Sequence, residues 1–264
     1  MAHARRRGLT TRRSEHVLNA DPWIQLSLLE LQGYDSALDR LTHQSRTLPV
    51  LARIAELEAR LGDLRSLVVA GETEVSDLKR EQAKADTDVE QVRDRSQRDQ
   101  QRLDSGMVSS SKDLEALQHE ITSLARRQSD LEDVELEVME RLESAQTHLD
   151  TLIAERAGVL AELETASAER DGALTEFGAE SKRIRAQREE LAPRIPDDLA
   201  ALYEKLRGQY DGVGAAALYR GRCEGCRLEI NPTEISRFRN ADNDTVLRCE
   251  ECRRILVRTA ESGL

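Results

Sequence analysis

The sequence has 264 residues, of which 34% are charged and 3% are aromatic, and its formal net charge is −11. So few large side chains cannot fill the core of a conventional globular domain of this length, and the composition is typical of coiled coils and long helices. No run of apolar residues approaches the roughly 18 that a membrane span requires, so we expect no membrane insertion.

The first 20 residues show neither periodicity nor an apolar cluster. They carry five arginines and one glutamate, a net charge of +4, and lack the apolar core of a secretory signal. We predict a disordered basic extension over residues 1–20; a nucleic-acid-binding arm and a start site placed too far upstream are the alternatives. Residues 215–264 carry +1, which leaves −16 for residues 21–214, and such an acidic segment repels nucleic-acid phosphates.

Helical structure is predicted from Asp21, which can cap a helix with Pro22 at its first position. The dense apolar residues at 23–31 indicate packing on the C-terminal domain or on a second chain. From Ile54 the apolar positions alternate by three and four, the signature of a coiled coil, while Pro49 either kinks the helix or marks a break. The predicted seam is Ile54, Leu57, Leu61, Leu64, Val68, Gly71, Val75, Leu78, Gln82, Ala85, Val89, Val92, Ser96, Asp99 and Leu103.

A glycine and four serines interrupt this pattern at residues 104–111. A second helix follows, whose apolar positions include Val134 and Val138 and one four-four step typical of a stutter. Residues 23–103 and 112–192 each have 81 positions, so we predict an antiparallel hairpin over residues 21–196 with its tip near 104–111. Parallel dimerisation of each helix is the alternative.

The remaining segment, residues 197–264, is predicted to hold a short helix and a zinc ribbon with short β strands. Its four cysteines form two C-x-x-C pairs separated by 22 residues. Two such turns can complete a tetrahedral shell of thiolates, so we predict one structural Zn²⁺ on Cys223, Cys226, Cys249 and Cys252. Two disulfides, which need an oxidising compartment, and a redox pair, which needs a βαβ context, are the alternatives. Reduced thiols without an export signal indicate the cytoplasm.

The surroundings of the cysteines carry two further expectations. Gly225 suits a position with positive φ in the first turn. Arginines lie within two residues of the ligands and either balance the thiolate charge or form a phosphate- or RNA-binding face, which neighbouring glutamates weaken; they are Arg222, Arg227, Arg248, Arg253 and Arg254. No nucleophile elbow or Gly-rich phosphate loop is present and the histidines are scattered, so we expect no enzyme.

The chain resembles the bacterial family of C4-type zinc ribbon proteins with a long coiled-coil hairpin. The resemblance extends over residues from about 21 to 258 and rests on the segments Ser111–Ile121, Ile195–Tyr203, Cys223–Leu228 and Arg248–Leu256. It differs at Arg253, where a glycine commonly follows the last cysteine. The resemblance implies a mostly α fold ending in a four-cysteine ribbon. Members in flagellated or secretion-competent bacteria look like assembly chaperones or regulators that bind protein partners, and some are linked to RNA.

From these features we expect a non-enzymatic adaptor or chaperone-like protein that binds protein partners. The alternative is a regulator that binds RNA or DNA through the arginine-flanked ribbon. The identity of the partner and the oligomeric state stay open at this stage.

Overall fold

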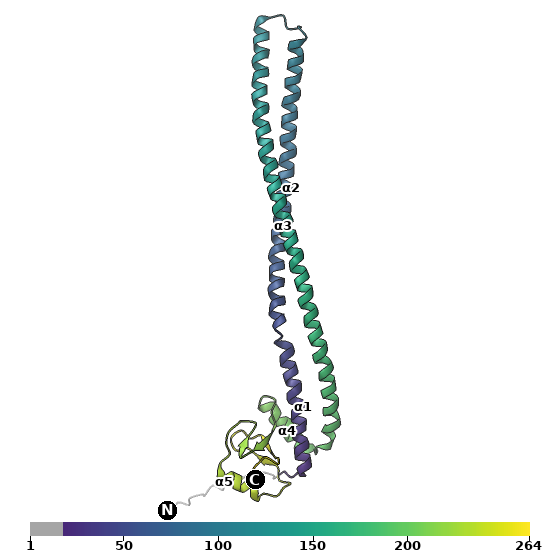
Figure 1. The fold of residues 1–264 in the computed structure, drawn as a ribbon, viewed down its shortest axis with the longest axis vertical. Coiled ribbons are helices and arrows are strands. Elements are labelled where there is room, and N and C mark those ends of the chain that lie inside the picture. Colours follow the sequence, from purple (N-terminus) through teal and green to yellow (C-terminus); the bar gives the residue numbers. More distant parts are fainter. Residues whose placement is uncertain (1–17) are drawn as a thin grey trace, which may run out of the picture. The chain divides into compact units, whose positions relative to one another are not determined.

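The computed structural model describes residues 18–264; the predicted extension lies outside the described residues except for its last three positions. The fold is mostly helical, with long helices that form a hairpin and short strands toward the C-terminus (Figure 1), which confirms the predicted fold class. The helices are α1 (Pro22–Arg46), α2 (Pro49–Asp104), α3 (Ser111–Leu191), α4 (Asp197–Gln209) and α5 (Pro232–Asn240), with a 3-10 turn η1 (Ala192–Arg194). The strands are β1 (Ala215–Tyr219), β2 (Arg222–Cys223), β3 (Leu247–Arg248) and β4 (Ile255–Arg258).

The chain forms two compact units. The hairpin unit comprises residues 49–170, and the ribbon unit comprises residues 18–48 together with 171–264. Among the described residues, no helix combines the length and apolar character needed to cross a membrane.

In the hairpin unit, α2 and α3 run antiparallel and side by side (Figure 1). Their contact buries the seam within one chain, so parallel dimerisation of each helix is not needed to bury it. Every predicted seam position of α2 is buried or half-buried, and none beyond Val89 is fully buried, where polar residues enter the seam. Cross-hairpin ion pairs are exposed and fix the register more than the stability; they are Arg53–Glu162, Arg60–Glu155, Arg141–Glu81, Arg93–Glu132 and Arg95–Glu120.

The seam of α3 differs from the prediction at two positions: Leu114, the first apolar position of the predicted helix, is 36% exposed, and Val134 lies outside the seam. Val134 is 48% exposed, whereas Glu135 is half-buried. With Glu135 in place of Val134, positions 128, 131, 135, 138, 142 and 145 alternate by three and four, so the stutter is absent; Glu132, beside this line, is half-buried too. The prediction was wrong at Val134 because it ranked Val134 and Glu135 by apolarity instead of by register.

The first arm is also not one helix of 81 residues. It divides into α1 with 25 residues and α2 with 56, because Thr47 and Leu48 are not helical. Pro49 begins α2 at a position where its missing N–H costs nothing, and proline disfavours the helical conformation in the residue before it. Of the two predicted effects of Pro49, the structure therefore has the break.

The ribbon unit packs α1, the end of α3 and α4 on one face of a small sheet. The strand order is β2-β1-β4-β3, with β1 and β4 parallel and the other pairs antiparallel. Leu28 and Leu31 of α1 are buried against this sheet, which confirms packing on the C-terminal domain, while Trp23 and Leu26 stay about half exposed. Successive sheet residues alternate between two clusters: Ala215, Ile255 and Val257 face the helices, and Ala216, Leu218, Leu247 and Leu256 face α5 and the cysteines.

Residues 18–20 add a short extended segment to this unit. The N–H of Val246 donates to the carbonyl of Leu18 (2.9 Å), and the N–H of Ala20 donates to the carbonyl of Asp244 (2.7 Å). The buried Gln25 side chain closes the corner, because its Nε2 donates to the carbonyls of Ala20 and Asn243. Residues 18–20 are thereby attached to the ribbon.

Candidate metal centre

The four cysteines come together in the ribbon unit. Cys223 ends β2 and Cys226 follows it in a turn, while Cys249 follows β3 and Cys252 precedes β4. The Sγ atoms of Cys223 and Cys252 are 3.8 Å apart, those of Cys226 and Cys249 are 3.9 Å apart, and all four lie within 4.8 Å of one another. A regular tetrahedron with metal–sulfur bonds of about 2.3 Å has edges of about 3.8 Å, so the cluster has the dimensions of a four-thiolate zinc site.

Each C-x-x-C pair forms a tight turn of the same construction. The N–H of Arg227 donates to the carbonyl of Cys223 (2.7 Å), and the N–H of Arg253 donates to the carbonyl of Cys249 (2.9 Å). Arg227 and Arg253 are the residues with positive φ, at 61° and 63°. The expectation that Gly225 takes this conformation was wrong, and the residue after the last cysteine is the one that benefits from glycine.

Gly225 is required for space instead. A Cβ at this position would lie 2.8 Å from Cδ of Arg254 and 3.0 Å from Cβ of Ala216. The first turn therefore packs directly on β1 and on the side chain that follows the second turn, which brings the two halves of the site together.

The electrostatics of the site favour a bound cation. Burial raises the pKa of the Cys223 and Cys249 thiols. The backbone N–H groups of Gly225 and Cys226 at Cys223, and of Glu251 and Cys252 at Cys249, oppose this effect only in part, so both pKa values stay raised. At Cys252 burial also raises the pKa, but the N–H and guanidinium of Arg254 and the nearby thiols outweigh it, so the pKa is lowered. Buried thiolates that cluster in this way require a compensating positive charge.

The five predicted arginines have different surroundings. Arg254 is committed to the fold: its Nε donates to the carbonyl of Val213 (2.9 Å), its Nη2 donates to that of Tyr210 (3.0 Å), and its guanidinium lies over the Tyr210 ring. The exposed Arg222 is paired with Glu224 at 3.3 Å. Arg227, Arg248 and Arg253 are exposed, and Nε of Arg248 donates to the carbonyl of Arg253. Arg254 is therefore not available to a shared basic face, and Arg222 is already paired with an acidic neighbour.

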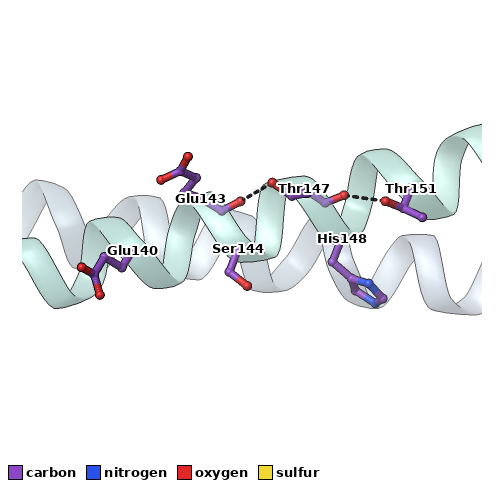
Figure 2. A pocket seen from close by; sticks show the side chains of 6 residues that line it. All are labelled: Glu140, Glu143, Ser144, Thr147, His148 and Thr151. Atoms are coloured by element: carbon purple, nitrogen blue, oxygen red, sulfur yellow. Dashed lines mark hydrogen bonds between the residues drawn. The ribbon is translucent and has the colours of Figure 1, made fainter.

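A polar depression on α3 of the hairpin unit also contains groups with catalytic potential (Figure 2). Its lining includes Glu140, Ser144 and His148, which are exposed. The hydroxyls of Thr147 and Thr151 donate to helix carbonyls one turn back, as Figure 2 shows. Within residues 18–264, the His148 ring makes no hydrogen bond that would orient it as a base. The depression has the character of a solvated helix surface.

Sequence analysis missed the buried polar groups that hold α1 against the other elements of the ribbon unit. Asp35, 1% exposed, accepts hydrogen bonds from Nε of Arg188 (2.6 Å) and from the Tyr203 hydroxyl (2.7 Å). Burial and this carboxylate raise the pKa of Tyr203. Gln32 accepts from the N–H of Gly214 (2.7 Å) and donates to the carbonyl of Gly212 (2.9 Å). Asp35 and Gln32 lie on the same face of α1 as Leu28 and Leu31. This shared face is the one signal in the sequence that could have identified them.

Arg258 at the end of β4 was missed as well. Its guanidinium donates to the carbonyl of Phe238 in the last turn of α5 and to those of Asp242 and Thr245 between α5 and β3, and burial lowers its pKa. The side chain holds the loop that precedes the second cysteine turn, so it positions the site without belonging to it.

Comparisons with known proteins agree with this architecture. Residues 31–211 match the model of the CT398-like coiled coil hairpin domain, and residues 222–256 match that of the C4-type zinc ribbon domain. The uncharacterized protein Rv2229c of Mycobacterium tuberculosis is 36% identical over 234 residues, which cover 89% of this chain and 95% of that protein. A solved structure from Mycobacterium smegmatis has a TM-score of 0.79 at 34% identity and covers 92% of this chain and 100% of its own. CT398 of Chlamydia trachomatis shares the fold, with a TM-score of 0.65 at 20% identity over 89% of this chain and 98% of its own.

Proposed function

We propose that this chain, which belongs to the bacterial family of CT398-like coiled-coil hairpin proteins with a C4-type zinc ribbon, is a non-enzymatic adaptor or chaperone-like protein that binds protein partners. Coiled-coil and zinc-ribbon domains fit a structural role and are not usually catalytic. The cytoplasm is the compartment in which its thiols stay reduced, and we place its action there.

The proposal includes one structural Zn²⁺ held by the four cysteines. Four protein thiolates fill the tetrahedral shell, so the ion has no open position for water or substrate. The zinc then acts by stabilising a ribbon whose own apolar core is small. Metal analysis of the purified full chain should give one zinc per chain, and a Cys252→Ser variant should bind it far more weakly. A stoichiometry of two, or zinc retained by that variant, would contradict this assignment.

Exposed apolar side chains on the hairpin are the observation that carries partner binding. Leu136 is 57% exposed and Met139 is 43% exposed, and neither belongs to the seam. Both line a groove of about 540 Å³ that also includes Lys79 and Gln82 of α2. Apolar surface rimmed by polar groups is typical of protein-binding sites, and methionine adapts to different partners.

Proximity labelling in the native host tests this function with the full chain. The wild type is compared with a Leu136→Glu, Met139→Glu double variant and with Leu160→Glu, a control on the same helix that is 49% exposed and outside the groove. We expect a set of proteins that the double variant loses and the control retains. Identical protein sets for all three chains would exclude the groove, and a set no larger than that of an unrelated coiled coil would exclude an adaptor.

Nucleic acid is the competing ligand class. A fluorescence titration with RNA and DNA oligonucleotides decides it, because phosphate contacts weaken steeply with salt. Salt-sensitive binding that is lost in an Arg227→Ala, Arg253→Ala double variant would replace the protein-adaptor function by nucleic-acid binding at the ribbon.

A further inference from the structure

Among residues 18–264, no strand pairs with the outer edge of β3. β3 is the last strand of the sheet and pairs on one side with β4. The N–H of Cys249 donates to the carbonyl of Arg254, so the backbone N–H and C=O groups of Leu247 and Cys249, on either side of Arg248, point toward β4. In an antiparallel ladder, alternate residues face opposite ways, and the N–H and C=O of Arg248 therefore point outward. Neither group has a backbone partner among residues 18–264.

This edge already pairs with extended chain one step away. Asn19 and Thr245 form an antiparallel bridge, flanked by the hydrogen bonds of Leu18 and Ala20 described above. Arg248 offers the next N–H and C=O of the same row beyond Val246. The row is thus in the geometry that accepts a further strand.

A groove of about 540 Å³ lies beside these groups. Its apolar lining includes Leu202 of α4, Phe238 of α5 and Leu247 of β3. Pockets of this kind beside an edge receive every second side chain of an added strand, since side chains alternate along it.

The rim of the groove carries both signs of charge, with the arginines that lack an ion pair within residues 18–264 next to the edge of β3. It has three arginines, Arg237, Arg248 and Arg253, and two acidic residues, Asp198 and Glu250. Arg237 is paired with Glu234, but no ion pair to Arg248 or Arg253 is present among the described residues. Both are exposed and stand at the end of this edge.

We propose that this edge of β3 is a docking site for an extended, acidic segment of a partner protein. The segment adds a strand along Arg248, places apolar side chains toward Leu202 and Phe238, and sets a carboxylate against Arg248 and Arg253. Main-chain hydrogen bonds supply affinity, while the groove and the arginines supply specificity. The inference rests on the proposed function and names the mode in which one partner class binds.

Fluorescence anisotropy on the zinc-loaded full chain tests the docking site. The probe is a short labelled peptide in which valine alternates with glutamate. Two control peptides carry lysine in place of glutamate, or N-methyl groups on alternate backbone amides. We expect saturable binding of the probe that weakens with salt, and about tenfold weaker binding of each control, since one loses the charge match and the other the hydrogen bonds.

Variants of the protein test whether the probe peptide binds at the outer edge of β3. Arg248→Glu combined with Arg253→Gly should weaken the probe about tenfold, and the glycine suits the positive φ at 253. Arg222→Glu is the matched control, because it reverses an exposed arginine on β2 at the opposite edge of the same sheet and should leave binding unchanged.

Four results would overturn the proposal. Equal binding of the N-methylated peptide would show that no strand is added. Binding that appears only after deletion of residues 2–17 would assign the edge to the chain's own N-terminal segment. Oligonucleotide binding tighter than that of the peptide, and lost in the same double variant, would assign it to nucleic acid. If proximity labelling captures the same partners with the Arg248→Glu, Arg253→Gly variant as with the wild type, the adaptor function stays intact and this docking mode is rejected.

Discussion

The hairpin unit and the ribbon unit are specified in different ways. The hairpin depends on one repeated feature, the seam of α2 and α3, and its exposed ion pairs add little to the stability of any position. The ribbon unit depends on single buried groups, such as Asp35, Gln32 and the four cysteines, each of which has its own partners. A repeat distributes the free energy of folding over many side chains, whereas a unit with a small apolar core concentrates it in few.

The largest expected effect is loss of the metal site. Cys249→Ser, or removal of metal by a chelator, should unfold the ribbon unit and leave most of the helical circular dichroism of the hairpin, because zinc contributes on the order of 10 kcal/mol to such small sites. Limited proteolysis with mass spectrometry locates the unfolded residues. Added zinc should restore the chelated wild type but not the variant, and a cooperative loss of all helical signal would contradict the independence of the two units.

A smaller but still large effect is expected at Asp35. Asp35→Ala leaves Arg188 and the buried hydroxyl of Tyr203 without their shared acceptor, and should lower the free energy of unfolding of the ribbon unit by about 3 kcal/mol. Asp39→Ala is the control: its side chain is 53% exposed and pairs with Arg207, so a loss below about 1 kcal/mol is expected. Urea unfolding measures both, and equal losses would show that burial of Asp35 is irrelevant.

The same contrast explains which parts of the structure the sequence could predict. A heptad pattern is local and repeated, so the seam and the tip followed from spacing, and two C-x-x-C pairs identified the cysteine cluster without any knowledge of the fold. Asp35 and Gln32 could not be distinguished from solvated helix residues, because their partners at Arg188, Tyr203 and Gly214 lie more than a hundred positions away. Spacing predicts a backbone role for Gly225, whereas the residue is needed for its close approach to Arg254 and Ala216, which spacing alone does not bring into contact.

A pair of valines tests whether the seam follows register or apolarity. Val138 is 2% exposed and Val134 is 48% exposed. Val138→Ala should therefore lower the stability of the hairpin by about 2 kcal/mol, and Val134→Ala by less than about 0.5 kcal/mol. Thermal melting by circular dichroism is sufficient for this comparison. Similar losses at both positions would restore the stutter and remove Glu135 from the seam.

The smallest effect concerns the pH dependence of that seam. Burial of Glu135, together with the neighbouring carboxylate of Asp86, raises the pKa of its carboxyl group. The folded hairpin therefore binds a proton more tightly than the unfolded chain, so this group makes the hairpin more stable as the pH falls from neutral toward the ordinary glutamate pKa, and less stable as the pH rises. Glu135→Gln should raise the melting temperature of the hairpin at neutral pH and diminish this gain on acidification, because the neutral amide needs no proton. Glu137→Gln, an exposed position on the same helix, is the control for the loss of one negative charge. If both variants melt alike at every pH, the effect comes from the overall acidity of the hairpin and not from a carboxylate held in its seam.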